Sequence, residues 1–197
     1  MPPIQKFRSP LAAGALLMCL VIPTAAAAKL PATKNTKIVP GKSMAGVKLD
    51  MTKKQVFAQW GKGSCPDPGL CEWQKKKPSF VGQYEVARVS FYKGKAIFLR
   101  VSGAFSKSSN KLVPGPLAKW KTSKGISLGS KKGAVPKAYP AAKYSGGEAA
   151  SFNLLLGSGR NTTITSFGFP SFGPSTNLVG GIGVDWSNCH FDSSTTC

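Results

Sequence analysis

The chain has 197 residues, a length that suits one domain or two small ones. Its 27 Lys and Arg residues outnumber its 7 Asp and Glu residues, and the formal net charge of +20 favours polyanionic partners. Because acidic residues and histidine are scarce, we expect no metal site and no cofactor.

The positive charge is concentrated in one part of the chain. Residues 29–143 hold 24 basic residues against 4 acidic ones, whereas residues 144–197 hold only Arg160 against three acids. Of the basic residues 23 are lysines, which act as hydrated point charges rather than as bidentate forks. This composition predicts attraction to an anionic polymer, and the alternative interpretation is a solvated, solubilising surface.

Residues 1–28 have the pattern of a removable signal peptide. Lys6 and Arg8 precede an apolar run at residues 11–22, and small residues follow at the spacing that signal peptidase accepts. A membrane anchor is the alternative, but the run is shorter than the roughly 20 residues that span a bilayer. We therefore expect a secreted, extracellular or cell-wall-associated protein without a transmembrane segment after signal removal.

Export determines how the cysteines are interpreted. Removal of the signal leaves four of them, an even number that indicates two disulfides in an exported chain. Three pairings are open, and sequence proximity favours Cys65–Cys71 and Cys189–Cys197. A four-thiolate zinc site is the alternative, but neither pair has the CxxC spacing that such sites use.

One stretch of the sequence occurs twice. Residues 46–61, GVKLDMTKKQVFAQWG, return 79 positions later as residues 125–140, GISLGSKKGAVPKAYP, and a β-rich stretch follows each copy. The repeat predicts two tandem modules. The expected organisation is a signal peptide at 1–28, a flexible basic lead-in at 29–38, a first module at 39–104, a linker at 105–118 and a second module at 119–197, its tail held by a disulfide.

Each copy of the repeat predicts a short helix. In the first copy Thr52 and Gln55 form a capping box, and Gly61 follows the expected helix at 53–60. The second copy has weaker signals because Gly133 occupies the position of Gln55 and Pro136 interrupts the helix.

A strand pair is expected at residues 84–102. A two-residue turn at Lys93 and Gly94 would mix polar and apolar faces, so we expect a three-residue loop with a left-handed Gly94, followed by a bulge. One face is then apolar and belongs to the core: Ala87, Val89, Phe91, Ile97, Leu99 and Val101. The other mixes aromatic and basic side chains: Tyr84, Val86, Arg88, Ser90, Ala96, Phe98 and Arg100.

This second face is the candidate binding surface, because aromatic and arginine side chains are enriched at interfaces. Its alternative role is burial beneath the second module. A basic and aromatic stretch at residues 73–77 extends the candidate set. The predicted binding residues are Tyr84, Arg88, Phe98, Arg100, Trp73, Lys75, Lys76 and Lys77.

The signals for catalysis are weak. No GxSxG nucleophile motif occurs, and the only histidine, His190, adjoins a cysteine that we expect to be oxidised. Glu72 and Glu85 are candidate hydrolytic carboxylates only by default. Basic and aromatic residues interleave as in single-strand binders, but export leaves nucleic acid as a non-specific partner.

The residues 46–61, with the pattern GxxLDMTKKQVxxxWG, resemble the glycine–methionine–threonine motif at the start of a helix in small envelope proteins. SmpA/OmlA outer-membrane lipoproteins carry this motif, and β-lactamase inhibitory proteins contain two similar modules in tandem. The second copy looks like the second module of uncharacterised secreted actinobacterial proteins. The resemblance covers residues 40–101 and, more loosely, 120–190, and it implies short helices on an antiparallel sheet and a non-enzymatic binding role. Asp50 departs from the usual glycine.

These observations predict an α+β fold of two tandem modules, each a short helical element packed on an antiparallel β-sheet. The predicted protein is an exported, non-catalytic, monomeric binding protein that engages a protein partner or an anionic cell-envelope polymer. The alternatives are an envelope-acting hydrolase with an unrecognised site and a wall-associated structural protein held by charge.

Overall fold

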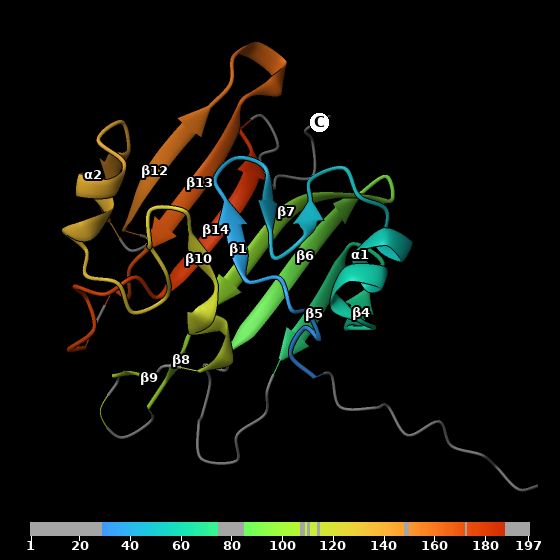
Figure 1. Ribbon diagram of the computed structural model, residues 1–197, viewed down its shortest axis with the longest axis horizontal. Helices are drawn as coiled ribbons and strands as arrows, with labels where there is room; N and C mark the ends of the chain where they lie inside the picture. The colour runs from blue at the N-terminus through green and yellow to red at the C-terminus, as the bar shows by residue number, and fades with distance from the viewer. Residues whose placement is uncertain are drawn as a thin grey trace, which may run out of the picture.

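The computed structural model describes residues 29–74, 85–106, 109, 111–113, 115–147, 150–171 and 173–187 (Figure 1). The predicted signal peptide, Cys189, His190 and Cys197 lie outside this part of the chain. The first half contains β1 (Lys37–Val39), β2 (Ser43–Met44), β3 (Val47–Lys48), α1 (Lys53–Trp60), β4 (Ser64–Asp67), β5 (Leu70–Gln74), β6 (Val86–Tyr92) and β7 (Lys95–Ser102). After these come β8 (Ala104–Phe105), β9 (Leu112–Val113), the 3-10 helix η1 (Pro116–Lys119), β10 (Lys121–Thr122), α2 (Ala134–Ala138), β11 (Lys143–Ser145), β12 (Ser151–Leu156), the 3-10 helix η2 (Gly159–Asn161), β13 (Thr163–Gly168) and β14 (Gly181–Trp186).

One antiparallel sheet of eight strands, ordered β11-β12-β13-β14-β7-β6-β5-β4, runs through both halves of the chain. Each half supplies a four-stranded meander, and β14 and β7 join the two meanders, with Ile182 opposite Val101 and Val184 opposite Leu99. Strand makes up 44% of the structure and helix 14%. The predicted α+β fold of two modules, each with its own sheet, is therefore wrong. The two halves share a single sheet because apolar residues alternate at the same register along β7 and β14.

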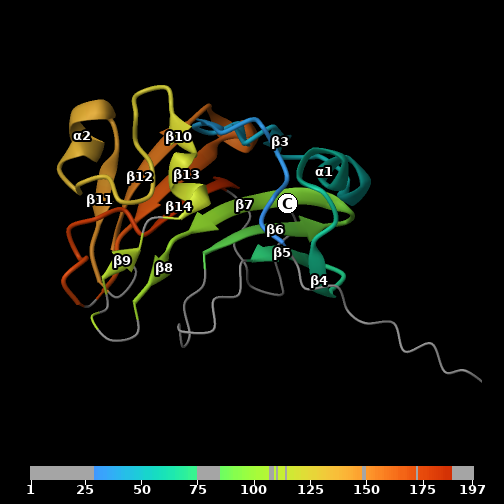
Figure 2. The ribbon, with the colours of Figure 1, turned by 60° about the horizontal axis from the view of Figure 1, so that its bottom comes forward.

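Among the described residues, the helices gather on one face of the large sheet (Figure 2). Both α-helices and a small sheet, ordered β10-β1-β2-β3, lie over one side, which we call the inner face. The Gly41 N–H donates to Thr165 Oγ1 on β13 at 2.7 Å, and the Asp50 N–H donates to the Ala96 carbonyl on β7 at 2.7 Å. These bonds tie the covering layer to both halves of the sheet. No described helix lies on the opposite, outer face.

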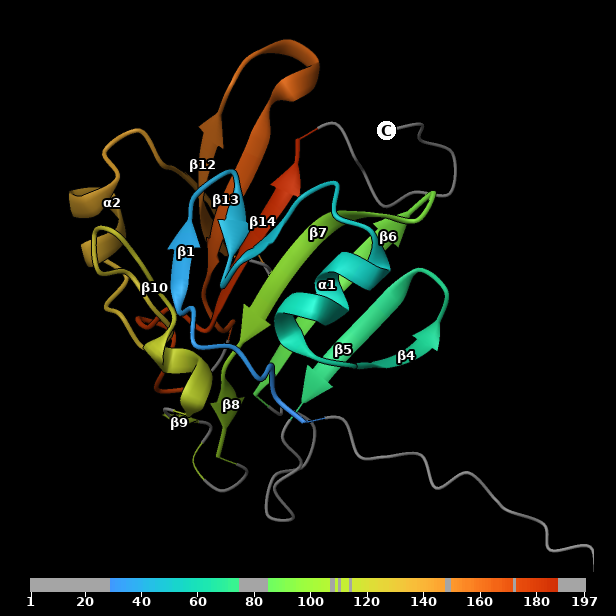
Figure 3. The ribbon, with the colours of Figure 1, turned by 45° about the vertical axis from the view of Figure 1, so that its right-hand side comes forward.

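The helix α1 has the start and the end that its sequence predicts. The Thr52 side chain accepts a hydrogen bond from the Gln55 N–H, and the Gln55 side chain accepts one from the Thr52 N–H at 2.8 Å. Gly61 follows the helix with a φ of 78°. Figure 3 shows α1 lying over the large sheet. An eight-residue helix is marginal alone, so burial of Val56 and Trp60 stabilises it.

Aromatic side chains join each helical segment to the large sheet. The rings of Trp60 and Trp73 meet edge to face with centroids 5.1 Å apart, and the Trp73 indole N–H donates to the Gly61 carbonyl at 3.0 Å. In the second half Tyr139, directly after α2, stacks on Phe167 of β13 at 5.5 Å. The two copies of the repeat thus place an aromatic residue in similar surroundings, and the duplication itself stays a prediction of the sequence.

The turn between β6 and β7 differs from the prediction. Lys93 and Gly94 both have positive φ, 46° and 75°, which is the backbone of a two-residue type I′ turn. The bulge that restores the faces comes later, where Phe91 pairs with Ala96 and Ser90 pairs with Phe98. Ile97 is therefore the extra residue, and Ala96 joins the core instead of the outer face.

The predicted disulfide between Cys65 and Cys71 is present and links β4 to β5. These two strands form a hairpin, with Ser64 opposite Glu72 and Asp67 opposite Leu70. Within the described residues, no helix combines the length and the apolar composition needed to cross a bilayer.

Candidate functional site

The outer face of the large sheet brings charged side chains from three neighbouring strands into one row. Arg88 on β6 lies opposite Glu72 on β5 and opposite Arg100 on β7. We call these three residues the arginine row. Side chains on one face of a sheet alternate with those on the other, and the buried neighbours Ala87, Val89, Leu99 and Val101 point to the inner face. The row therefore points away from the core.

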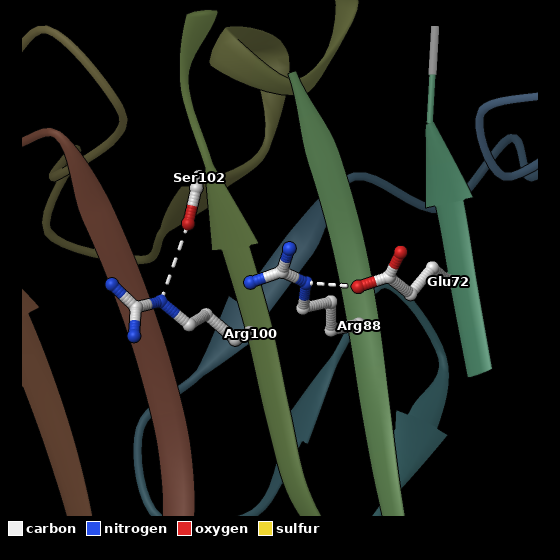
Figure 4. A network of polar contacts seen from close by, with 4 residues as sticks. All are labelled: Glu72, Arg88, Arg100 and Ser102. Carbon is white, nitrogen blue, oxygen red and sulfur yellow. Dashed lines mark hydrogen bonds and ion pairs between the residues drawn. The ribbon is translucent and has the colours of Figure 1, made fainter. Parts of the chain in front are cut away.

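The two arginines have different partners (Figure 4). Arg88 Nε is 2.5 Å from Glu72 Oε1, and the two side chains are 45% and 16% exposed. Arg100 Nε donates to Ser102 Oγ at 3.2 Å, and among the described residues this neutral hydroxyl takes the place of a counterion. The row consequently carries two positive charges and one negative charge. Partial burial, and secondarily the charge of Arg88, lower the pKa of Arg100.

Glycines on β14 make room for the side chains of β7. A Cβ atom at Gly183 would lie 3.1 Å from Phe98 Cε2, and one at Gly181 would lie 3.5 Å from Arg100 Nη2. Both glycines face outward, because Gly183 pairs with Arg100 and Gly181 pairs with Ser102. Phe98 and Arg100 therefore lean over the backbone of β14 at the line where the two halves of the sheet meet.

A second row, mainly apolar, runs beside the arginine row. Cross-strand pairing places one outward residue from each of six strands in line: Leu70, Ser90, Phe98, Asp185, Ile164 and Leu155. We call this set the apolar row. Leu155 is 53% exposed, and the other members are partly exposed. Half-exposed apolar side chains next to arginine are typical of protein interfaces.

Asp185 is the one carboxylate in the apolar row. Its Oδ1 atom is buried and makes no hydrogen bond among the described residues. Burial raises its pKa to about 7, although a hydrogen bond from the Trp186 backbone acts in the opposite direction. At neutral pH this carboxyl is therefore partly neutral, and it offsets the charge of the arginines only in part.

The structure separates the predicted binding residues. Arg88, Arg100 and Phe98 lie together on the outer face, as the alternation predicts. Trp73 lies in the core with 1% of its surface exposed, so it stabilises the fold and cannot reach a partner. Tyr84, Lys75, Lys76 and Lys77 are outside the described residues. Neither Ser102 nor Asp185 is among the predicted residues. Ser102 lies on the same side of β7 as Arg100, and Asp185 reaches this surface through the pairing of β14 with β7.

The candidate catalytic carboxylates already have structural partners. Glu72 pairs with Arg88, and Glu85 is buried, where its Oε1 accepts a hydrogen bond from the Leu117 N–H at 2.5 Å. His190 is outside the described residues. Among the residues that are described, no three His, Cys, Asp or Glu side chains are grouped in a way that could hold a metal ion.

No protein-family model and no curated protein matches the sequence. Among solved structures, a DUF4309 family protein from Bacillus subtilis is 10% identical with a TM-score of 0.40, and the match covers 69% of this chain and 78% of that one. An extracellular protein containing an SCP domain from Bacillus anthracis is 15% identical with a TM-score of 0.38, covering 71% and 44%. A cysteine-rich secretory protein from Staphylococcus aureus is 10% identical with a TM-score of 0.39, covering 81% and 52%.

These likenesses are too distant to carry an argument about fold or function. None of the three is described as an SmpA/OmlA lipoprotein or a β-lactamase inhibitory protein. The resemblance of residues 46–61 to those families therefore stays a prediction.

Proposed function

We propose that this chain is an exported, non-catalytic binding protein that engages an acidic protein partner through the outer face of its large sheet. The observation that carries the proposal is the arginine row, with its uncompensated positive charge, beside the apolar row on a face that no described helix covers. The partner would offer a carboxylate next to an apolar side chain.

Arg100 is the expected anchor of this contact. Among the described residues its guanidinium makes one hydrogen bond, through Nε to Ser102, which leaves the Nη groups to bind a carboxylate as a fork. Phe98, on the same strand, and Leu155, three strands away on β12, would lose solvent-exposed apolar surface in the same contact. Burying apolar area contributes roughly 25 cal/mol per Å². The apolar row would therefore supply affinity, while the contact of Arg100 with a carboxylate fixes the position of the partner.

Two further observations support the export and the non-catalytic role. The Cys65–Cys71 disulfide is typical of an oxidising compartment, in agreement with the predicted signal peptide. Glu72 and Glu85 are engaged in an ion pair and in a buried hydrogen bond, so neither is set apart as a general acid or base.

The test compares Arg100→Glu with Arg160→Glu on an affinity column. Arg160 is a matched control, because it is exposed on η2, away from the arginine row. Immobilised wild-type protein is exposed to culture fluid and cell-surface extract of the producing organism and washed at 0.5 M NaCl. We expect a protein that wild type and R160E retain and R100E loses, and calorimetry with that purified protein should reproduce the difference.

Equal retention by R100E and wild type would show that the outer face is not the binding site. The absence of any protein retained at 0.5 M NaCl would contradict a protein partner altogether. Circular dichroism of each variant checks that it is folded, so that a loss of binding is not confused with a loss of structure.

A further inference from the structure

The small sheet on the inner side carries a second charged surface, distinct from the arginine row. Its inward residues Ile38, Met44, Val47 and Thr122 pair across the four strands and are buried. Its outward surface carries exposed lysines on β1, β3 and β10 and in the turn after β1: Lys37, Lys48, Lys121 and Lys42. We call these four residues the lysine layer.

The lysine layer contains a like-charge pair. Lys37 on β1 lies directly opposite Lys121 on β10 in a parallel pairing. Like charges opposite one another on neighbouring strands destabilise a sheet by roughly 0.2–1 kcal/mol. Among the described residues none of the four lysines forms an ion pair, and the ion pair between Arg88 and Glu72 belongs to the arginine row on the outer face. The charge of the lysine layer is thus uncompensated within the described chain.

No exposed aromatic side chain accompanies these lysines on the strands of the small sheet. The two tryptophans nearest in sequence to this layer, Trp60 and Trp120, are 1% and 3% exposed, and their rings pack against each other at a tilt of 51°. Proteins that bind single-stranded nucleic acid combine a basic groove with aromatic platforms on which bases stack. The lysine layer offers the charges without the platforms.

We propose that the lysine layer binds a linear polymer of phosphodiesters that lacks aromatic bases. Lys37 and Lys121 stand on neighbouring strands roughly 4.8 Å apart, and Lys48 lies on β3, two strands from β1. A flexible chain that crosses the strands can therefore meet an ammonium group at successive points. The ligand is recognised by its charge spacing and not by its sequence. Because this layer and the outer face lie on opposite sides of the large sheet (Figure 2), the polymer and a protein partner can bind at the same time.

The salt dependence of binding gives the expected contribution of the four lysines to the affinity for the polymer. Each phosphate neutralised on a single strand contributes a slope of about −0.7 in log K against log salt. Engagement of all four lysines therefore predicts a slope of about −3, and removal of two of them predicts a slope of about −1.4. At 50 mM salt the same relation predicts a loss of affinity of roughly 10- to 100-fold for the double variant.

The test uses two probes of equal length and charge, an abasic deoxyribose phosphate oligomer and an oligothymidylate. The variant K37Q/K121Q is compared with the control K54Q/K137Q, which removes the same charge from exposed positions on α1 and α2. Dissociation constants are measured by fluorescence anisotropy at 50 mM salt. For wild type and for K54Q/K137Q, we expect the constants for the two probes to agree within about threefold. For K37Q/K121Q, we expect binding roughly 10- to 100-fold weaker than that of wild type.

Three results would overturn this proposal. Equal weakening in the two double variants would mean that net charge alone attracts the polymer. Binding of oligothymidylate at least tenfold tighter than the abasic oligomer would assign the layer to nucleic acid. No binding of the abasic oligomer by wild type at 50 mM salt would exclude the site. Urea unfolding of K37Q/K121Q controls for folding, because removal of a like-charge pair should leave the variant at least as stable as wild type. None of these results depends on R100E, which tests the outer face separately.

Discussion

Replacing Arg100 with glutamine tests whether repulsion between the two arginines of the arginine row lowers the stability of the fold. Arg100 faces Arg88 across β6 and β7, and within the described part of the chain its one hydrogen bond is to the neutral Ser102. Glutamine retains part of the aliphatic stem and a donor for Ser102 while removing the charge. If the two guanidinium groups repel each other, the variant should be relieved of that repulsion.

The magnitude follows from the geometry of the row. Two unit charges about 6 Å apart in water repel by about 0.7 kcal/mol, which agrees with the roughly 0.2–1 kcal/mol found for like charges opposite in a sheet. Glu72 offsets part of the charge of Arg88, so the lower half of that range applies. At 1 M salt the Debye length is about 3 Å, and the repulsion should vanish.

The assay is urea unfolding of wild type, Arg100→Gln and the control Arg160→Gln at 20 mM and 1 M NaCl. Urea is uncharged, so the ionic strength stays under control. For each variant, the free energy of unfolding is compared with that of wild type at the same salt concentration. For R100Q this difference should be more favourable at 20 mM than at 1 M NaCl by about 0.2–0.5 kcal/mol. For R160Q it should be the same at both concentrations. If R100Q is destabilised by more than about 1 kcal/mol at both salt concentrations, Arg100 has a structural role and the reasoning behind the outer-face proposal is wrong.

Three further predictions concern stability. Leu99→Ala, at a fully buried position on β7, should cost about 2–5 kcal/mol in urea unfolding, whereas Leu155→Ala on the outer face should stay within about 0.5 kcal/mol; equal effects would contradict the assignment of the two faces. Replacing Cys65 and Cys71 together with alanine should cost about 2 kcal/mol, because the bridge closes a short loop in the unfolded chain; an unchanged urea midpoint would mean that the bridge does not limit the unfolded state. Because the pKa of Asp185 is raised to about 7 in the folded chain, the native state binds the extra proton and stability should fall as pH rises from about 4 to 7. Asp185→Asn should flatten this part of the stability profile, and an unaltered profile would show that the carboxyl is not buried in solution.

The sequence alone determined the local features of the fold. The Thr52 and Gln55 capping box and Gly61 delimit α1 at the predicted residues because a helix end is decided by its own hydrogen-bond donors and acceptors. The Cys65–Cys71 bridge follows from proximity along the chain. Alternation along β6 and β7 placed Arg88 and Arg100 on one face, since the side-chain period of a strand is two.

Only the tertiary structure decided what those features combine to form. The pairing of β7 with β14 joins residues about 80 positions apart in sequence, and no local pattern specifies which strand edges meet. That pairing turned two expected modules into one sheet and brought Asp185, Gly181 and Gly183 beside Arg100. Trp73 followed a basic and aromatic pattern in the sequence, yet it packs on Trp60 in the core, because burial depends on the element that covers a residue and not on its neighbours in the chain.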